Sequence, residues 1–179
     1  MSRRSRVPEL KLTGDWSEFL RLLHKHRVRF LIIGAHALAA HGRPRFTGDF
    51  DVLVEPTPAN ARRVYAALQD FGVGGRVNEE FFAAADAAGA AGLTIGVPPV
   101  RLDVLKSISG VSFDEAWRTR ISAHFEGKRV AVIGLDAYIK NKRASGRAKD
   151  LLDIALLEES GVVVASVPRR RARRRKKTS

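Results

Sequence analysis

The chain has 179 residues, a net charge of +13 and 45% hydrophobic residues, a size and composition that suit one globular domain with a buried core. It contains no cysteine, which excludes disulfides, a zinc ribbon and a thiol nucleophile, and it has no apolar run of about 18 residues that could span a membrane. No apolar segment follows the basic start of the chain, so we expect no secretion signal and a cytoplasmic location.

The positive charge is concentrated at the two ends of the chain. Eight of the nine residues 169–177 are Lys or Arg, and Arg3, Arg4 and Arg6 add three more positive charges. Subtracting these eleven from +13 leaves the residues between them nearly neutral, at about +2. We therefore predict a flexible basic N-terminus over residues 1–14, one domain over 15–161 and a disordered basic tail over 162–179. The tail either binds nucleic acid weakly through its phosphates or is a solvated charge run without a specific partner.

Hydrophobic periodicity predicts helices and strands that alternate along the domain. Capping boxes at Asp15 with Glu18 and at Ser112 with Glu115 indicate two helix starts, and Thr57-Pro58 indicates a third. Further helices are expected over residues 35–40, 78–88, 135–144 and from 147 to about 160; strands are expected over 28–33, 50–54, 93–95, 100–105, 121–125 and 129–133. The predicted fold is α/β in the broad sense (α+β), with a mixed sheet flanked by helices.

Two aspartates on one strand are the most informative feature of the sequence. Because side chains alternate along a strand, Asp49 and Asp51 point to one face, and Phe50, Val52 and Val54 point to the other, buried face. Two carboxylates this close repel each other unless a cation lies between them, and carboxylate oxygens suit Mg²⁺ or Mn²⁺. Such ions would activate a hydroxyl and neutralise a triphosphate during phosphoryl transfer.

A third carboxylate, Asp103, lies on the later strand predicted over 100–105. If that strand lies beside the first, Asp103 would join the pair as a general base or as a ligand of a second metal ion. The alternative is a structural salt bridge with Arg101 or Lys106. Upstream, Gly34 and Ala35 form a strand-to-helix turn whose N–H groups could hold phosphate oxygens.

This order of motifs resembles the nucleotidyltransferase superfamily of polymerase-β-like enzymes. The form Arg45-x-Thr47-x-Asp49-x-Asp51, and the basic run 142–150, are similar to the branch of abortive-infection type toxin nucleotidyltransferases. The resemblance covers about residues 29–159. The family turn usually reads Gly-Gly or Gly-Ser, whereas this chain has Gly34-Ala35.

The resemblance implies a role for each matching residue. It implies that the three aspartates bind divalent metal (Mg²⁺ or Mn²⁺) and carry catalysis, and that the nucleotide is bound by Gly34, Ala35, Arg45, Thr47, Lys142, Arg147 and Lys149. For the last three residues the alternative is a solvated helix face. Asp150 and Asp153 are expected to pair with Arg147 or Lys149, and His36 and His41 are expected to be surface or packing residues.

Two functions from different classes follow. The first is an enzyme that transfers NMP from an NTP to tRNA, protein or a small molecule such as an antibiotic. The resemblance adds the hypothesis that it is the toxin of a toxin–antitoxin pair, with an antitoxin partner. The second is an inactive module of the same fold that binds nucleic acid through the basic tail. An intact set of three carboxylates favours the enzyme, because unneeded acids that face one another cost stability.

Overall fold

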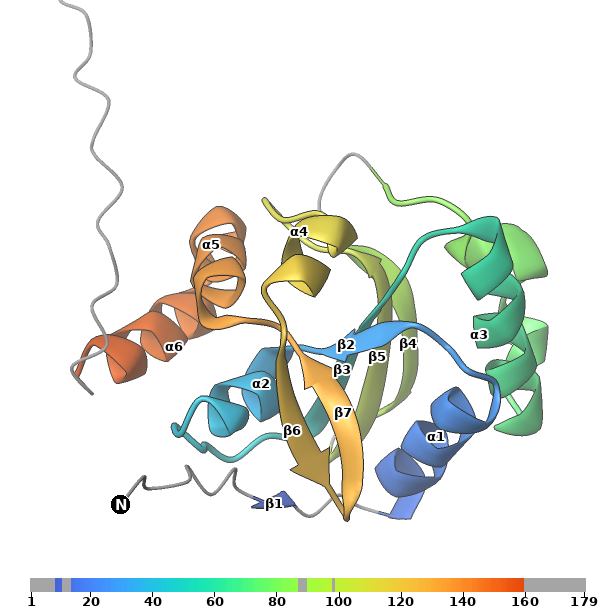
Figure 1. Cartoon of the computed structure of the whole chain (residues 1–179), viewed down its shortest axis with the longest axis horizontal. Helices are drawn as coiled ribbons and strands as arrows, with labels where there is room; N and C mark the ends of the chain where they lie inside the picture. The colour runs from blue at the N-terminus through green and yellow to red at the C-terminus, as the bar shows by residue number, and fades with distance from the viewer. Residues whose placement is uncertain (1–8, 11–13, 87–89, 98, 160–179) are drawn as a thin grey trace, which may run out of the picture.

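The computed structural model describes residues 9–10, 14–86, 90–97 and 99–159 (Figure 1). Its elements, in chain order, are β1 (Glu9–Leu10), α1 (Gly14–Lys25), β2 (Phe30–Ile32), α2 (Gly34–Ala40), β3 (Asp49–Val54), α3 (Pro58–Asp70), two short 3₁₀ helices η1 (Gly74–Arg76) and η2 (Glu79–Phe82), β4 (Ala91–Val97), β5 (Val100–Ser107), α4 (Phe113–Arg118), β6 (Ile121–Phe125), β7 (Lys128–Val132), α5 (Leu135–Ser145) and α6 (Ala148–Glu158). Within these residues, no helix is long and apolar enough to cross a membrane.

The strands of the described residues form one mixed sheet in the order β1-β6-β7-β2-β3-β5-β4. β3 lies inside the sheet, antiparallel to β2 and parallel to β5. In Figure 1, α1 and α3 lie to the right of the sheet, and α2, α5 and α6 lie to its left. The predicted mixed sheet flanked by helices is therefore confirmed. Because β3 has a hydrogen-bonded neighbour on each side, side chains at its start have a rigid support.

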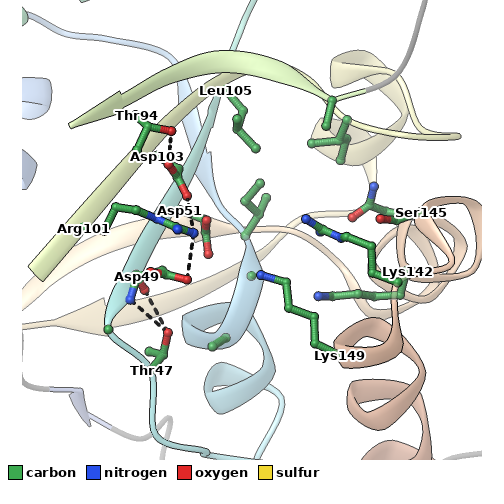
Figure 2. A pocket seen from close by; sticks show the side chains of 18 of the residues that line it. Thr47, Asp49, Asp51, Thr94, Arg101, Asp103, Leu105, Lys142, Ser145 and Lys149 are labelled. Atoms are coloured by element: carbon green, nitrogen blue, oxygen red, sulfur yellow. Dashed lines mark hydrogen bonds and ion pairs between the residues drawn. The ribbon is translucent and has the colours of Figure 1, made fainter. Parts of the chain in front are cut away.

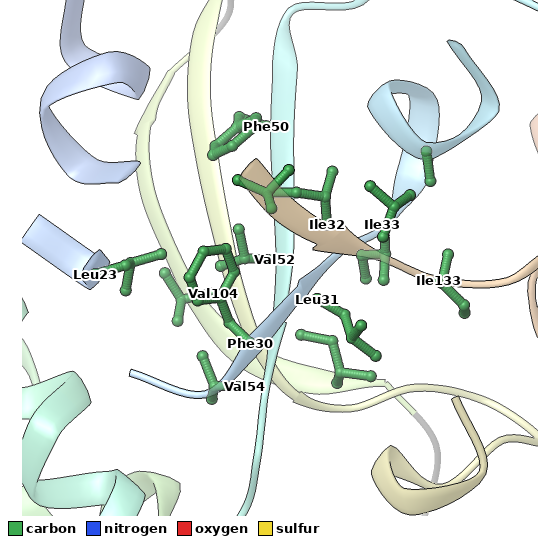
Figure 3. Packing of buried hydrophobic residues seen from close by; sticks show 14 of the residues in the cluster. Leu23, Phe30, Leu31, Ile32, Ile33, Phe50, Val52, Val54, Val104 and Ile133 are labelled. Carbon is green, nitrogen blue, oxygen red and sulfur yellow. The ribbon is translucent and has the colours of Figure 1, made fainter. Parts of the chain in front are cut away.

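The hydrophobic core fixes the orientation of β3. Phe50, Val52 and Val54 are fully buried, and Figure 3 shows Val52 and Val54 near Phe30 of β2. Trp16 of α1 stacks on Phe50 with 5.8 Å between the ring centroids. Burying such side chains contributes about 1.5–3 kcal/mol each. A one-residue slip of β3 would expose them and would bury Asp49 and Asp51 in their place, so the core fixes which face carries the aspartates.

The predicted helix starts agree with the structure at two of three positions. Thr57 and Ser112 are N-caps whose side-chain oxygens accept hydrogen bonds from the backbone N–H groups of Asn60 and Glu115, at 3.3 and 3.2 Å. Helix α1 begins at Gly14, so Asp15 lies in its first turn instead of capping it. There its charge still favours the helix N-terminus.

The segment predicted as a helix over 78–88 differs from the prediction. Only Glu79–Phe82 is helical, as one 3₁₀ turn, and residues 87–89 lie outside the described part. Phe82 is fully buried, and its ring meets that of Phe81 edge-on at 4.8 Å. Packing of these two rings after α3 overrides the helix propensity of the alanines that follow.

The boundaries predicted for the domain and its tails stay predictions. Both basic ends, residues 1–8 and 160–179, lie outside the described residues. Two residues of the segment predicted to be flexible, Glu9 and Leu10, form β1 and pair in parallel with β6.

Candidate active site

Asp49 and Asp51 lie at the start of β3, on the face opposite the core. Both are partly accessible, whereas Phe50 and Val52 between and after them are fully buried. This is the alternation predicted from the sequence.

The parallel neighbour β5 brings the third carboxylate to the same place. Its register pairs Asp103 with Asp51 and Arg101 with Asp49. Figure 2 shows the side chains of Asp49, Asp51, Asp103 and Arg101 grouped on one side of the two strands. The structure thus brings together the three aspartates that the sequence singled out.

The turn between β2 and α2 lies directly against Asp51. Gly34 has a φ of +65°, and a Cβ at this position would lie 2.1 Å from Oδ2 of Asp51. The backbone N–H of Ile33 donates a hydrogen bond of 3.1 Å to the carbonyl oxygen of Asp51. Only glycine combines this φ with so close an approach, so Gly34 lets the carboxylate reach the turn. Ala35 follows it and is buried.

Arg101 and Thr94 hold the carboxylates in place. Nη2 of Arg101 donates to Oδ2 of Asp49 at 2.9 Å and lies 3.1 Å from Oδ2 of Asp103. The hydroxyl of Thr94 donates to Oδ1 of Asp103 at 2.6 Å. The salt bridge between Asp103 and Arg101, which the sequence offered as the alternative, is therefore present in the structure together with the carboxylate cluster. Among the described residues, no group of three or more His, Asp or Glu side chains is arranged so that it could hold a metal ion without a change in conformation.

Asp51 has an unusual acidity. Burial, and then the negative charges of Asp103 and Asp49, raise its pKa from 3.8 to about 6. The positive charges of Lys149 and Lys142 lower the pKa in part. The raised pKa means that the ionised form of Asp51 has too little positive charge around it to offset its burial and the two neighbouring carboxylates. A divalent cation, for which carboxylate oxygens are suitable ligands, would supply that charge.

Thr47 supports Asp49 through the backbone. Its hydroxyl accepts a hydrogen bond from the Asp49 N–H at 3.1 Å and donates to the Asp49 carbonyl oxygen at 3.2 Å. Thr47 also lines the pocket in front of the carboxylates. It therefore orients the start of β3 and stays within reach of a ligand.

Lys142 lies in a buried ion cluster between α5 and α6. Its ammonium is 2.6 Å from Oδ1 of Asp150 and 2.8 Å from Oδ2 of Asp153, and its side chain is 6% exposed. The hydroxyl of Tyr138 donates to Asp153 at 3.1 Å. Lys142 lines the pocket, but its charge is already shared by two carboxylates.

Of the other basic residues predicted to bind the nucleotide, Arg45 and Arg147 are paired with aspartates and Lys149 is not. Nε of Arg45 donates to Asp153 at 2.7 Å, and Nε of Arg147 donates to Asp150 at 2.8 Å. Lys149 also lines the pocket and makes no hydrogen bond or ion pair within the described residues. Asp150 pairs with Arg147 as expected, whereas the partners of Asp153 come from outside α6.

These side chains surround a cavity of about 390 Å³. The carboxylates form one wall. Residues that were not predicted as site residues complete the lining, namely Ile33, Phe46, Gly48, Ala90, Thr94, Arg101, Leu105, Ile108, Ser109, Asn141 and Ser145. In Figure 2 the ammonium of Lys149 points from α6 toward the carboxylates. The alternation of β5 puts Arg101 and Leu105 on the face of Asp103, and it is the sequence signal that indicates these two lining residues.

His36 of α2 and His41, which caps the end of this helix, do not line the cavity. His36 is buried among the rings of Trp16, Phe50 and Phe125, and burial lowers its pKa to about 4. Nε2 of His41 is 2.9 Å from the carbonyl oxygen of Ile133. Both are packing residues.

Comparison with known proteins shows the fold. No protein-family model matches the sequence, and no curated protein matches it. Among solved structures, the antibiotic-resistance factor ANT(2'')-Ia is 13% identical, with 82% of each chain covered and a TM-score of 0.52. The chain has the fold of this protein, and the predicted α/β fold with a mixed sheet is confirmed.

Two other solved structures are similar at lower TM-scores. One is the lincosamide antibiotic adenylyltransferase LnuA with lincomycin bound, which is 13% identical over 82% of this chain and 96% of that one, with a TM-score of 0.47. The other is a putative nucleotidyltransferase from Thermotoga maritima, 12% identical over 80% of this chain and 94% of that one, with a TM-score of 0.45.

Proposed function

We propose that this protein is a divalent-metal-dependent nucleotidyltransferase, which transfers an NMP group from an NTP to an acceptor and releases pyrophosphate. The observation that carries the proposal is that Asp49, Asp51 and Asp103 meet at one cavity wall, beside the turn at Gly34. The fold shared with ANT(2'')-Ia supports it at the level of architecture. The resemblance of the motif order to the nucleotidyltransferase superfamily gives the reaction.

Asp49 and Asp51 would bind Mg²⁺ or Mn²⁺ through their carboxylate oxygens. The bound ion would neutralise the triphosphate and lower the pKa of the attacking hydroxyl. Asp51 fits this role because its ionised form is short of compensating positive charge. Thr47 keeps Asp49 in position through its two backbone hydrogen bonds.

The remaining residues have roles at the transferred group. An acceptor oxygen forms a bond to the α-phosphorus while the bond from that phosphorus to the bridging oxygen breaks, and the bond electrons leave with pyrophosphate. Asp103 either accepts the hydroxyl proton or binds a second ion. Lys149, the unpaired ammonium of the cavity, is placed to bind the triphosphate. Gly34 and Ala35 would contact it through the backbone.

The acceptor predicted from the sequence is tRNA, a protein or a small molecule. Because ANT(2'')-Ia is described as an antibiotic-resistance factor, a small molecule with a hydroxyl group is the first acceptor to test. Membership of the abortive-infection branch, a toxin role with an antitoxin partner and a cytoplasmic location are further parts of the proposal.

NTP binding measured by calorimetry tests the proposal. The wild type, with and without Mg²⁺, is compared with the double variant Asp49→Asn/Asp51→Asn. We expect metal-dependent binding that the double variant loses. Asp114→Asn changes an exposed aspartate of α4 that does not line the cavity, and it should leave binding unchanged. If the wild type binds no NTP with metal present, or if the double variant binds equally well, the proposal is wrong. The chain would then be better described as an inactive module of this fold.

A further inference from the structure

Arg101 occupies the space between two of the proposed metal ligands. Its Nη2 atom lies 2.9 Å from Oδ2 of Asp49 and 3.1 Å from Oδ2 of Asp103. Asp51, between them in sequence order and paired with Asp103 across the strands, makes no ion pair with Arg101 in the structure. One nitrogen therefore joins the two outer carboxylates of the cluster.

This position conflicts with a bound divalent cation. Mg²⁺ binds oxygen at about 2.0–2.1 Å, so carboxylates that share an ion must come closer to a common centre than they now are to Nη2. While the guanidinium lies between Asp49 and Asp103, these two side chains cannot close around a metal. This arrangement agrees with the finding that no group of three such side chains among the described residues is positioned to hold a metal ion.

The contacts that hold Arg101 are also incomplete. The same Nη2 atom serves both carboxylates, instead of the paired two-nitrogen geometry that makes arginine–carboxylate contacts strong. Nε of Arg101 is buried and has no hydrogen-bond partner. A buried donor without a partner is unfavourable, which weakens the hold on this conformation. The side chain of Arg101 is 30% exposed and lines the cavity, so the guanidinium has space to move away from the two carboxylates.

We infer that Arg101 is a resident counter-ion of the carboxylate cluster, and that it competes with a divalent cation for the oxygens of Asp49 and Asp103. The inference rests on the proposed function, because it takes these carboxylates to be metal ligands. It adds a residue that sets the affinity of the carboxylate cluster for metal. Without Arg101, the cluster would bind a divalent cation more tightly, because no internal cation would compete for the same oxygens.

Direct measurement of Mn²⁺ binding to the full chain, without nucleotide, tests the inference. Free Mn²⁺ is counted by electron paramagnetic resonance for the wild type and for Arg101→Gln, which removes the charge at similar size. We expect Arg101→Gln to bind Mn²⁺ at least about fivefold more tightly, the lower end of typical coupling between competing ligands. Arg101→Lys keeps a charge but loses the planar group, and its affinity should lie between the two.

Two controls separate the possible results. Arg118→Gln removes one positive charge from an exposed residue at the end of α4 and should match the wild type. Asp49→Asn/Asp51→Asn in the Arg101→Gln background should abolish the gain. Thermal unfolding of each variant without metal checks that it is folded. If Arg101→Gln fails to fold, Arg101→Lys decides the same question.

The outcomes distinguish failure of the inference from failure of the proposed site. If the wild type and Arg101→Gln bind Mn²⁺ equally, and the aspartate variant does not bind, the metal site stands and the role of Arg101 is wrong. Weaker binding by Arg101→Gln also overturns the inference, because Arg101 would then assist the site. If the aspartate variant binds as well as its parent, the site itself is wrong, and the inference fails with it.

Discussion

The carboxylate of Asp51 rests on the backbone of Gly34, so closely that a single added carbon would lie 2.1 Å from its Oδ2 atom. This contact joins the strand that carries the proposed metal ligands to the turn proposed to hold the triphosphate. The two parts of the site therefore depend on one residue without a side chain.

Gly34→Ala should damage this contact. Alanine at a φ of +65° costs about 1–2 kcal/mol, and displacement of Asp51 by the added carbon should cost about 1–3 kcal/mol more. Gly42→Ala is the matched control, because Gly42 has a φ of +85° but nothing lies within 4 Å of a Cβ there. Urea unfolding of both variants gives the difference in the free energy of unfolding. If the two variants lose the same stability, the close approach of Asp51 is not a constraint.

The acidity of Asp51 should make the metal-free protein less stable as the pH rises. A carboxyl whose pKa is raised from 3.8 to about 6 in the folded state binds its proton more tightly there than in the unfolded chain. Its contribution to stability is complete below about pH 4 and is lost as the pH rises through about 6. The loss is on the order of 3 kcal/mol.

Asp51→Asn tests this effect, because it keeps the size of the side chain and removes the charge. With a chelator present, the variant should be more stable than the wild type at pH 7.5, and the two should become similar near pH 4. Burial lowers the pKa of His36, His41 and His24, which acts in the opposite direction, but both proteins share this contribution. Asp114→Asn serves as the control for loss of an exposed aspartate. An unchanged difference between the two proteins at the two pH values would contradict the prediction.

The carboxylate cluster was predictable from the sequence because its geometry is local. The two-residue period of β3 puts Asp49 and Asp51 on one face, and the period of β5 puts Asp103 and Arg101 on one face. The one long-range assumption was that the two strands are neighbours. Once that is met, the contact of Arg101 with Asp49 follows from the register.

The ion pairs of Lys142 were not predictable, because they depend on how α5 packs against α6. The sequence shows a lysine, a glycine at 146 and two aspartates, and it permits the lysine to face either the cavity or the next helix. In the structure the ammonium lies between Asp150 and Asp153. The short 3₁₀ helix at residues 79–82 was also not predictable, because it depends on the burial of Phe82 in the folded chain.

Lys149→Gln should weaken NTP binding with little loss of stability. Its ammonium lines the cavity and makes no hydrogen bond or ion pair within the described residues, and its effect on the fold is limited to its charge, which lowers the pKa of Asp51. A lost charge-assisted contact to phosphate should cost about 1.5–3 kcal/mol of binding free energy. Lys128→Gln, at the exposed start of β7, is the control for charge. Calorimetry with Mg²⁺ and NTP measures both variants, and equal affinities would place the triphosphate elsewhere.

Lys142→Met should unfold the protein more readily, whatever its effect on nucleotide binding. Removing the ammonium leaves Asp150 and Asp153 buried, with only Arg147 and Arg45 to balance them. Breaking a buried ion cluster in this way costs about 3–5 kcal/mol. Lys140→Met on the same helix is the control, because Lys140 is 53% exposed and pairs with Glu115 at 2.7 Å, a contact worth at most about 1 kcal/mol. Urea unfolding compares the two variants. If Lys142→Met is as stable as Lys140→Met but loses NTP binding, Lys142 acts on the nucleotide, as the family resemblance implies, and the buried cluster is not what keeps α5 and α6 together.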